Sequence, residues 1–435
     1  MEETWRWFGP DDAVRLGEIR QAGATGIVTA LHHIPYGEGW SEDEIARRRG
    51  LIAADPALGL RWSVVESLPV AEAVKLGEGD LEPIFDNYRR SLRNLARAGV
   101  TTVCYNFMPV IDWTRTELAA PLPGGGTALR FNADEHAAFD CFMLQRKDAE
   151  GEYAPDVLDR ARAWFKASSE SDRARLLATI MAGLPGAYDR YDVPGLRRML
   201  DRYSGIGRGD LRANLKRFLE AVVPTAEEAG IRMAIHPDDP PRSLFGLPRI
   251  VSGEADLEFI TLSVPSPANG ITLCTGSLGA GAQNDLPALA HRFARDIHFV
   301  HLRNVSKEPD GSFAEAQHLD GDIDMVRVIG ALLEEEERRL DAGGSAIPFR
   351  PDHGHEILDD LSRKTHPGYP LYGRMKGLAE LRGVMHAVAA LRTAPPVSAA
   401  PGADSSFGED EGRGTRDEAP PTSDANRKVP SLRRA

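Results

Sequence analysis

The chain has 435 residues, of which 42% are hydrophobic and 27% charged, and it carries a formal net charge of −13. This composition is ordinary for a folded protein and excludes fibrous and wholly disordered classes, while the negative charge argues against a nucleic acid partner. No run of about 18 apolar residues occurs and the N-terminus lacks a signal-peptide pattern, so we predict a cytoplasmic protein with no membrane partner.

Short apolar segments alternate with amphipathic segments along most of the chain. The amphipathic stretches, such as residues 11–22, 41–54 and 81–98, are typical of helices. Eight strands alternating with helices indicate an α/β fold, the (β/α)8 TIM barrel. A doubly wound sheet also alternates, but the first connection lacks a Gly-x-Gly-x-x-Gly turn. The predicted strands are residues 4–8, 26–33, 60–70, 100–110, 231–237, 271–275, 297–304 and 347–352.

One connection is longer than a barrel requires. About 120 residues separate the fourth and fifth predicted strands, where roughly thirty suffice. Because this segment contains a Gly-rich turn and charged helical stretches, we predict a helical insertion over approximately residues 111–208. Such a segment can be a lid over an active site or an oligomerisation arm, and the sequence leaves both uses open. We expect a homo-oligomer, a dimer.

The C-terminal end of the chain differs in composition from the rest. Residues 394–435 are rich in Pro, Ala, Ser and Gly, and Phe407 is their only aromatic residue. Such a segment buries too little apolar surface to offset its ordering entropy. We therefore predict a barrel domain over residues 1–393 and a disordered tail over 394–435.

Four consecutive predicted strands end in residues that bind transition metals. Because reactive groups in such barrels project from the carboxyl ends of the strands, these side chains meet at one rim. Alone, a buried Cys is more often a small hydrophobic residue, and a strand-end His is more often a satisfied polar group. Together they indicate a mononuclear site, with ligand types that suit Zn²⁺, Fe²⁺ or Mn²⁺. The four residues are His236, Cys274, His301 and Asp352.

Strand seven contains a second histidine. His298 and His301 are three positions apart and face opposite sides of a strand, so at most one points into the barrel. His301 lies nearer the carboxyl end and is the better ligand candidate.

Candidate acids and bases follow the last strand. His353 comes directly after Asp352, and Tyr369 and Tyr372 lie in the next loop. These residue types can transfer protons, although ordinary loop packing would explain them equally well.

Polar residues at the same rim could bind a substrate. Arg303 and Arg350 share the inward orientation of the strand-end ligands and favour an anionic substrate, although a buried salt bridge would also explain Arg350. His32 and His33 end the second predicted strand, and Asn106 lies in the fourth. The two histidines could bind sugar hydroxyls, or they could simply begin a solvated loop.

At these residues the chain resembles the mannonate dehydratases of hexuronate breakdown, a branch of the xylose-isomerase-like barrels. The resemblance extends from the first strand to about residue 392. The matching stretches are residues 5–10 (Trp-Arg-Trp-Phe-Gly-Pro), 23–35, 103–109 (Val-Cys-Tyr-Asn-Phe-Met-Pro), 273–277 (Leu-Cys-Thr-Gly-Ser), 300–304 (Val-His-Leu-Arg-Asn), 350–355 (Arg-Pro-Asp-His-Gly-His) and 367–369 (Pro-Gly-Tyr).

The resemblance implies dehydration of D-mannonate to 2-keto-3-deoxy-D-gluconate in glucuronate catabolism. It implies one Mn²⁺ or Fe²⁺, held by the four strand-end residues. It also implies that His353 and Tyr369 are the acid/base pair, without deciding which is which.

Other functions fit the same fold less well. A sugar isomerase or epimerase usually places several carboxylates on its metal, whereas this site offers a thiolate and one carboxylate. A barrel-type DNA repair endonuclease would need a metal cluster and a basic face. A non-catalytic sugar-acid-binding protein would not need His353 and Tyr369.

Overall fold

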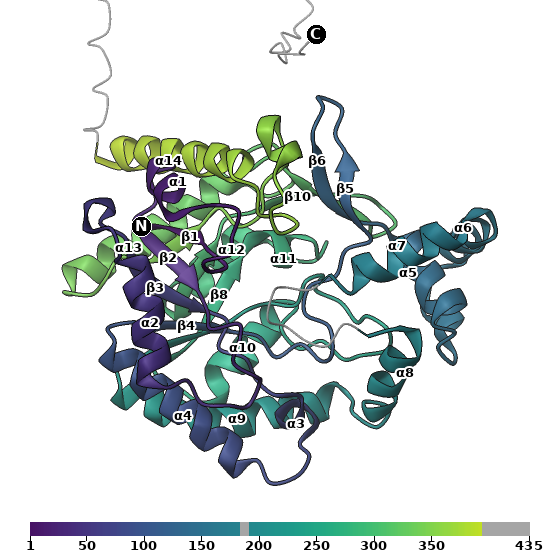
Figure 1. The fold of residues 1–435 in the computed structure, drawn as a ribbon, viewed down its shortest axis with the longest axis horizontal. Coiled ribbons are helices and arrows are strands. Elements are labelled where there is room, and N and C mark those ends of the chain that lie inside the picture. Colours follow the sequence, from purple (N-terminus) through teal and green to yellow (C-terminus); the bar gives the residue numbers. More distant parts are fainter. Residues whose placement is uncertain (183–190, 394–435) are drawn as a thin grey trace, which may run out of the picture. The chain divides into compact units, whose positions relative to one another are not determined.

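Eight parallel strands close into a barrel in the computed structural model, which describes residues 1–182 and 191–393 (Figure 1). The predicted (β/α)8 barrel is therefore confirmed. Neighbouring strands follow the order β1-β12-β9-β8-β7-β4-β3-β2 around the barrel. The tail predicted to be disordered, residues 394–435, lies outside the described residues. The barrel strands are β1 (Glu2–Arg6), β2 (Gly26–Thr29), β3 (Arg61–Glu66), β4 (Thr102–Tyr105), β7 (Arg232–Ile235), β8 (Asn269–Cys274), β9 (Ile297–His301) and β12 (Pro348–Arg350).

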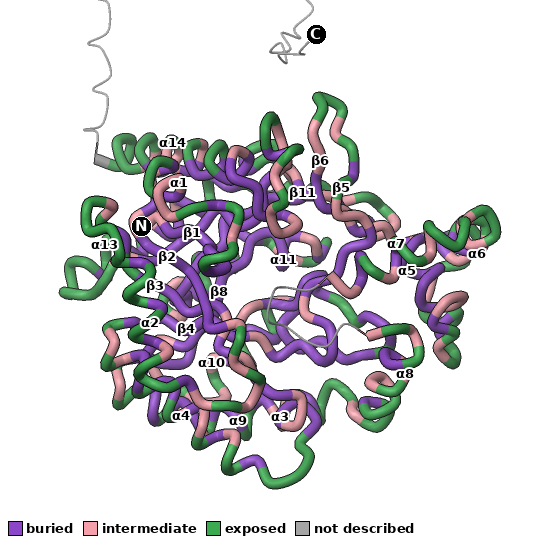
Figure 2. The backbone as a smooth tube through the Cα atoms, viewed as in Figure 1, coloured by how far each residue is buried: buried purple, intermediate pink, exposed green. Residues whose placement is uncertain are grey.

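Helices surround the barrel strands on the outside. Figure 2 shows the strands buried and the outward surfaces of the helices exposed, as expected when each helix packs one apolar face on the sheet. Among the described residues, none of the helices has both the length and the apolar character needed to cross a bilayer. The outer helices are α1 (Leu16–Gln21), α2 (Glu42–Ile52), α3 (Glu72–Leu76), α4 (Glu82–Arg97), α9 (Arg208–Glu228), α10 (Glu254–Ser263), α12 (Leu286–Arg292), α13 (Met325–Asp341) and α14 (Tyr372–Thr393). The short helix α11 (Thr275–Gly279) follows β8 directly and is buried throughout.

The strand register determines which side chains face the barrel interior. A small apolar cluster inside the barrel includes Val28 and Cys104. Arg6 pairs with Val28, and Glu66 pairs with Cys104, so all four face inward because register partners in a parallel pair share a side. The same alternation places five inward side chains at the carboxyl ends of their strands: Arg6, Glu66, Cys274, His301 and Arg350.

The long connection between β4 and β7 is only partly helical. It contains the helices α5 (Ala133–Ala138), α6 (Pro155–Ala167), α7 (Glu170–Ile180) and α8 (Val193–Arg202), which lie to the right of the barrel in Figure 1. It also contains two strands that the sequence did not predict, β5 (Glu117–Pro121) and β6 (Thr127–Phe131). These strands join β10 (Asn304–Lys307) and β11 (Phe313–Ala316) in an antiparallel sheet of order β10-β11-β6-β5. Their pairing partners lie far along the chain, so no local pattern announces them.

This small sheet lies on the side of the barrel where reactive groups are expected. β10 begins just after the carboxyl end of β9, and β11 pairs with β6 through Phe313 and Phe131. The two phenyl rings stack with centroids 5.6 Å apart. The sheet therefore delivers side chains of β11 to the barrel rim.

Candidate active site

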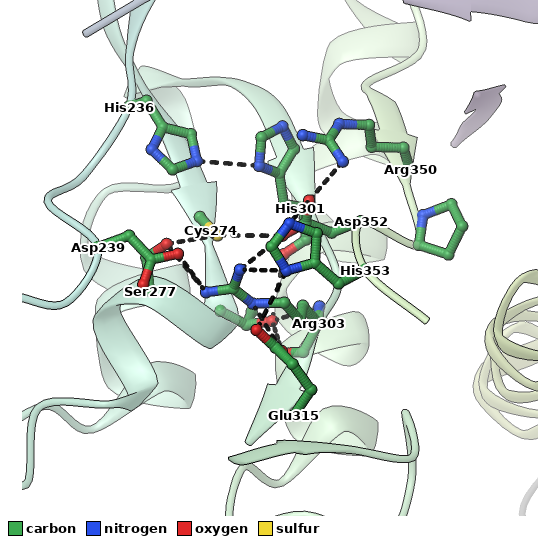
Figure 3. Close-up of polar contacts among 12 residues, drawn as sticks. His236, Asp239, Cys274, Ser277, His301, Arg303, Glu315, Arg350, Asp352 and His353 are labelled. Carbon is green, nitrogen blue, oxygen red and sulfur yellow. Dashed lines mark hydrogen bonds and ion pairs between the residues drawn. The ribbon is translucent and has the colours of Figure 1, made fainter. Parts of the chain in front are cut away.

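Three of the predicted metal ligands meet at the carboxyl end of the barrel (Figure 3). Ligand atoms of His236, Cys274 and His301 all lie within 4.8 Å of one another. His236 Nε2 is 3.1 Å from His301 Nδ1, and His236 Nδ1 is 2.7 Å from the carbonyl oxygen of Pro237. Because a carbonyl only accepts, Nδ1 of His236 donates to it and Nε2 carries the lone pair that faces the site. Two imidazoles and a thiol in this arrangement fit a transition-metal ion.

Asp352, the fourth predicted ligand, adjoins this group. Its Oδ2 atom lies 3.7 Å from Cys274 Sγ, and its Oδ1 atom accepts a hydrogen bond from Arg350. The backbone of Asp352 has φ of 62°, a left-handed conformation that costs energy for a non-glycine residue and recurs at functional sites. Burial would raise the pKa of Asp352, but Arg350, His353 and Arg303 hold it well below its usual range. The carboxylate is therefore ionised, and in this structure its partners are Arg350 and Arg303.

A buried network of arginines and carboxylates lies beside the donor group. Arg115 donates to both oxygens of Asp239, at 2.8 and 3.1 Å, and to Glu315 at 2.8 Å. Arg303 donates to Asp239 at 2.8 Å and lies 3.3 Å from Glu315. Burial would raise the pKa of each carboxyl, but the guanidinium groups lower the pKa of Glu315 to about 2 and that of Asp239 further. These carboxylates are ionised, and each forms ion pairs with two guanidinium groups.

His353 and Tyr369 are neighbours at the rim. The imidazole of His353 meets the ring of Tyr369 edge-on, with centroids 5.0 Å apart. His353 Nδ1 lies 3.1 Å from Glu315 Oε1 and 3.0 Å from Arg303 Nη1. Since a carboxylate only accepts and a guanidinium only donates, this nitrogen has a partner whether or not it carries a proton. Burial raises the pKa of Tyr369 well above its usual range, which keeps the phenol protonated.

A small cavity opens between these groups. Side chains of β3, β4 and β12 and of the loops that follow β3, β4, β7, β9 and β12 line it. His236 of the donor group therefore shares this cavity with the candidate acid and base. Its polar lining includes Glu66, Asn106, Asp112, His236, Asp239, Arg303, Arg350, Asp352, His353 and Tyr369.

The sequence and fold of this chain match those of one known enzyme family. The D-mannonate dehydratase (UxuA) family model matches residues 1–394. The chain belongs to the D-mannonate dehydratase family. Two curated mannonate dehydratases, from Chromohalobacter salexigens and a Marinomonas species, are 59% and 53% identical over 89% and 88% of this chain and over 99% and 98% of their own lengths. The crystal structure of mannonate dehydratase from Streptococcus suis serotype 2 superposes with a TM-score of 0.70 at 34% identity, covering 92% of this chain and 97% of that one.

Family membership selects among the predicted functions. D-mannonate dehydratases are metal-dependent hydro-lyases, and neither the isomerase nor the binding-protein alternative is favoured. Among the described residues of this chain, His236, Cys274 and His301 form a group that could hold such a metal ion.

Some of the residues predicted to bind substrate line the cavity of this dehydratase-family chain, and some do not. Asn106 lines it and donates to Asp112 at 2.8 Å. Arg303 and Arg350 also line it, but both are engaged by carboxylates.

The other three residues predicted to bind substrate are not among those that line the cavity. His32 lies 3.5 Å from Arg6, whereas His33 points to the surface and pairs with Glu44 at 2.9 Å. The ring of Tyr372 lies beneath the guanidinium of Arg363, 5.7 Å from it, so of the two loop tyrosines it is Tyr369 that reaches the cavity.

Several site residues were not singled out from the sequence. Glu66 contacts Arg350 through both oxygens, at 2.7 and 3.0 Å, and lies 3.5 Å from His301 Nε2. It ends β3 and faces inward, so the reasoning applied to the metal ligands could have found it. Asp239 could have been found likewise, because it closely follows β7. No local signal points to Glu315, because β11 belongs to the small sheet outside the barrel.

Proposed function

We propose that this chain converts D-mannonate to 2-keto-3-deoxy-D-gluconate and water, using one Mn²⁺ or Fe²⁺ held by His236, Cys274, His301 and Asp352. The observation that supports the ligand set is the convergence of two imidazole nitrogens and a thiol within 4.8 Å, with an ionised carboxylate beside them. A bound divalent ion would supply Lewis-acid stabilisation of the negative charge that develops on the substrate carboxylate.

His353 is the proposed base that removes the proton from C2. With its Nδ1–H donated to Glu315 at 3.1 Å, the lone pair of the imidazole lies on Nε2 and can accept that proton. The resulting imidazolium keeps its contact with the ionised Glu315, which stabilises the positive charge. Arg303 and Arg115 hold Glu315 in place from its other sides.

Tyr369 is the proposed acid. The C3 hydroxyl leaves as water once it takes a proton, and the enol that remains becomes the 2-keto acid by tautomerisation. A buried phenol with a raised pKa remains protonated until a developing hydroxide demands its proton. The ring contact with His353 places base and acid on neighbouring sides of the same cavity.

The test uses metal-stripped protein to which Mn²⁺, or Fe²⁺ without oxygen, is added back while the 2-keto product is followed. Metal-dependent product from D-mannonate is expected, and no product from folded, metal-loaded protein would overturn the proposal. Tyr369→Phe should lose turnover, whereas Tyr372→Phe, a tyrosine three positions away in the same region, should keep it. Equal losses in the two variants would contradict the assignment of Tyr369.

We also propose that residues 1–393 form the catalytic domain, with an insertion over residues 111–208. The net charge of −13 supports the absence of a nucleic acid partner.

We further propose that the chain acts in the cytoplasm as a homodimer. Sedimentation velocity at micromolar concentration should give twice the mass of one chain. A single species of monomer mass would contradict the assembly.

A further inference from the structure

Among the described residues, three arginines at or just after the carboxyl ends of barrel strands point toward the rim, and carboxylates bind two of them. Arg350 holds Glu66 through two hydrogen bonds and also contacts Asp352. Arg303 contacts Asp239, Glu315 and Asp352. Carboxylates within the protein compensate the charges of both arginines, although Nε of Arg303 has no hydrogen-bond partner among the described residues.

Arg6 is different. It ends β1, faces inward with Val28, and is 1% exposed. Its Nε and Nη1 atoms have no hydrogen-bond partner among the described residues, and its Nη2 lies 3.5 Å from His32 Nε2. The guanidinium also lies over the ring of Phe8, 4.9 Å from its centroid. None of these contacts is a carboxylate.

The surroundings of Arg6 do not neutralise it. Burial lowers the pKa of Arg6, and Glu66, the anion that most opposes this shift, is already bound to Arg350. Burial and the charge of Arg6 also hold the pKa of His32 well below its usual range, so this neighbour is neutral. An uncompensated buried cation is costly, which indicates a partner that arrives with the ligand.

The position of Arg6 connects it to the cavity. Arg6 ends β1, which pairs with β12, the strand that carries Arg350. Its guanidinium lies over Phe8, whose ring meets that of Tyr369 edge-on with centroids 4.9 Å apart. Arg350 and Tyr369 line the cavity, so Arg6 lies directly behind its wall, one side chain from the space in which the substrate of the proposed reaction must sit.

We propose that Arg6 binds the carboxylate of the sugar-acid substrate. This inference rests on the proposed function, because the carboxylate of D-mannonate is the anionic partner that Arg6 does not have within the protein. A guanidinium matches a carboxylate in geometry and forms charge-assisted hydrogen bonds with it. Arg303 and Arg350, which the sequence indicated for this role, instead hold the carboxylates of the site in place.

The experiment compares an acid with a neutral polyol in the Mn²⁺-loaded full chain. KM and kcat are measured for D-mannonate, and D-mannitol, which has the same carbon chain without a carboxylate, is measured as a competitive inhibitor. Arg6→Gln should raise KM for D-mannonate roughly 10- to 100-fold, the range for a lost charge-assisted hydrogen bond. The inhibition constant of D-mannitol should not change. Arg6→Lys should raise this KM less, because lysine keeps the positive charge but cannot donate two parallel hydrogen bonds to a carboxylate.

The matched control is Arg339→Gln. Arg339 is also buried, but it donates to Glu335 and to the carbonyl of Ala294, away from the rim. This variant should keep the wild-type KM. An unchanged KM in Arg6→Gln, or an equal weakening of D-mannonate and D-mannitol, would overturn the inference. If Arg6→Gln does not fold, an unchanged KM in Arg6→Lys has the same meaning.

A binding measurement separates this inference from the proposed function. D-mannonate should raise the melting temperature of the wild-type protein, and Arg6→Gln should lose that shift while keeping its own fold by circular dichroism. A wild-type protein that binds D-mannonate without turnover would overturn the proposed reaction and leave Arg6 to be judged by binding alone. Equal acid binding by wild type and Arg6→Gln would overturn the role of Arg6.

Discussion

Two neighbouring groups at the rim, a donor side and a scaffold side, satisfy their polar atoms in opposite ways. On the donor side, the ligand atoms of His236, Cys274 and His301 face one another at close range. On the scaffold side, directly beside them, Asp239 and Glu315 are each held by two guanidinium groups. One side presents electron-pair donors that need a cation, and the other is already neutralised from within.

This difference distinguishes residues that are suited to bind a metal ion from residues that hold the structure of the site in place. Imidazole and thiol groups that face each other gain little from the contact, so their arrangement makes sense as a site prepared for a metal ion. A buried ion-pair network in contrast compensates its own charges and holds neighbouring side chains in fixed positions. Substitutions on the first side should remove activity and leave the fold, whereas substitutions on the second should weaken the fold.

The largest effect is expected from Cys274→Ala. Removing the thiolate takes one ligand from the donor group, so bound metal and turnover should be lost together while the circular dichroism spectrum stays unchanged. Metal content by mass spectrometry and the rate of 2-keto product formation measure both. Cys141→Ala, a partly exposed cysteine in the inserted segment, is the control and should retain both. Full metal occupancy in Cys274→Ala would contradict the ligand assignment.

His353→Asn should keep the metal and lose turnover. General base catalysis contributes roughly 10²- to 10⁴-fold, and kcat should fall by about that factor. Metal analysis and steady-state kinetics on the same preparation are the measurements. A wild-type rate in this variant would remove His353 from the mechanism.

Asp239→Asn tests the scaffold side. Breaking a buried ion pair by removing one partner costs about 3–5 kcal/mol, and urea unfolding at neutral pH should show a loss of that order. The sign of the pH dependence follows from the lowered pKa of Asp239. The ionised Asp239 contributes fully to the free energy of unfolding above its pKa in the unfolded chain, about 3.9, and this contribution is lost as the pH falls toward its pKa in the folded protein. The difference in unfolding free energy between wild type and Asp239→Asn should therefore become smaller at low pH. A difference that does not change with pH would contradict the ion-pair account.

The smallest effect is expected from His33→Gln. His33 pairs with Glu44 on the surface, and its side chain is 56% exposed. Exposed pairs of this kind contribute little, so melting temperature and KM should both match the wild type. A raised KM for D-mannonate would show that His33 reaches the substrate after all, as its sequence position first indicated.

The sequence alone could predict much of the site, because the barrel obeys a simple rule. Once eight strands alternate with helices, their carboxyl ends meet at one rim, and the period of two assigns each residue to the inside or the outside. That is why His236, Cys274 and His301 could be grouped before any coordinates. The same rule separates His301 from His298, which instead donates to the carbonyl of Met233 at 2.8 Å.

Only the tertiary structure decided which of these polar groups are already paired. Arg350 and Glu66 are 284 positions apart in the chain, and Arg115 and Glu315 are 200 apart, yet each pair is in direct contact. The sequence therefore marked Arg350 as a substrate anchor, although its charge is compensated, and it did not single out Arg6, whose charge is not. Strand order and side-chain alternation follow from backbone hydrogen bonding and can be counted along the chain. The partner of a buried charge depends on where distant loops and strands finally pack, and no local pattern carries that information.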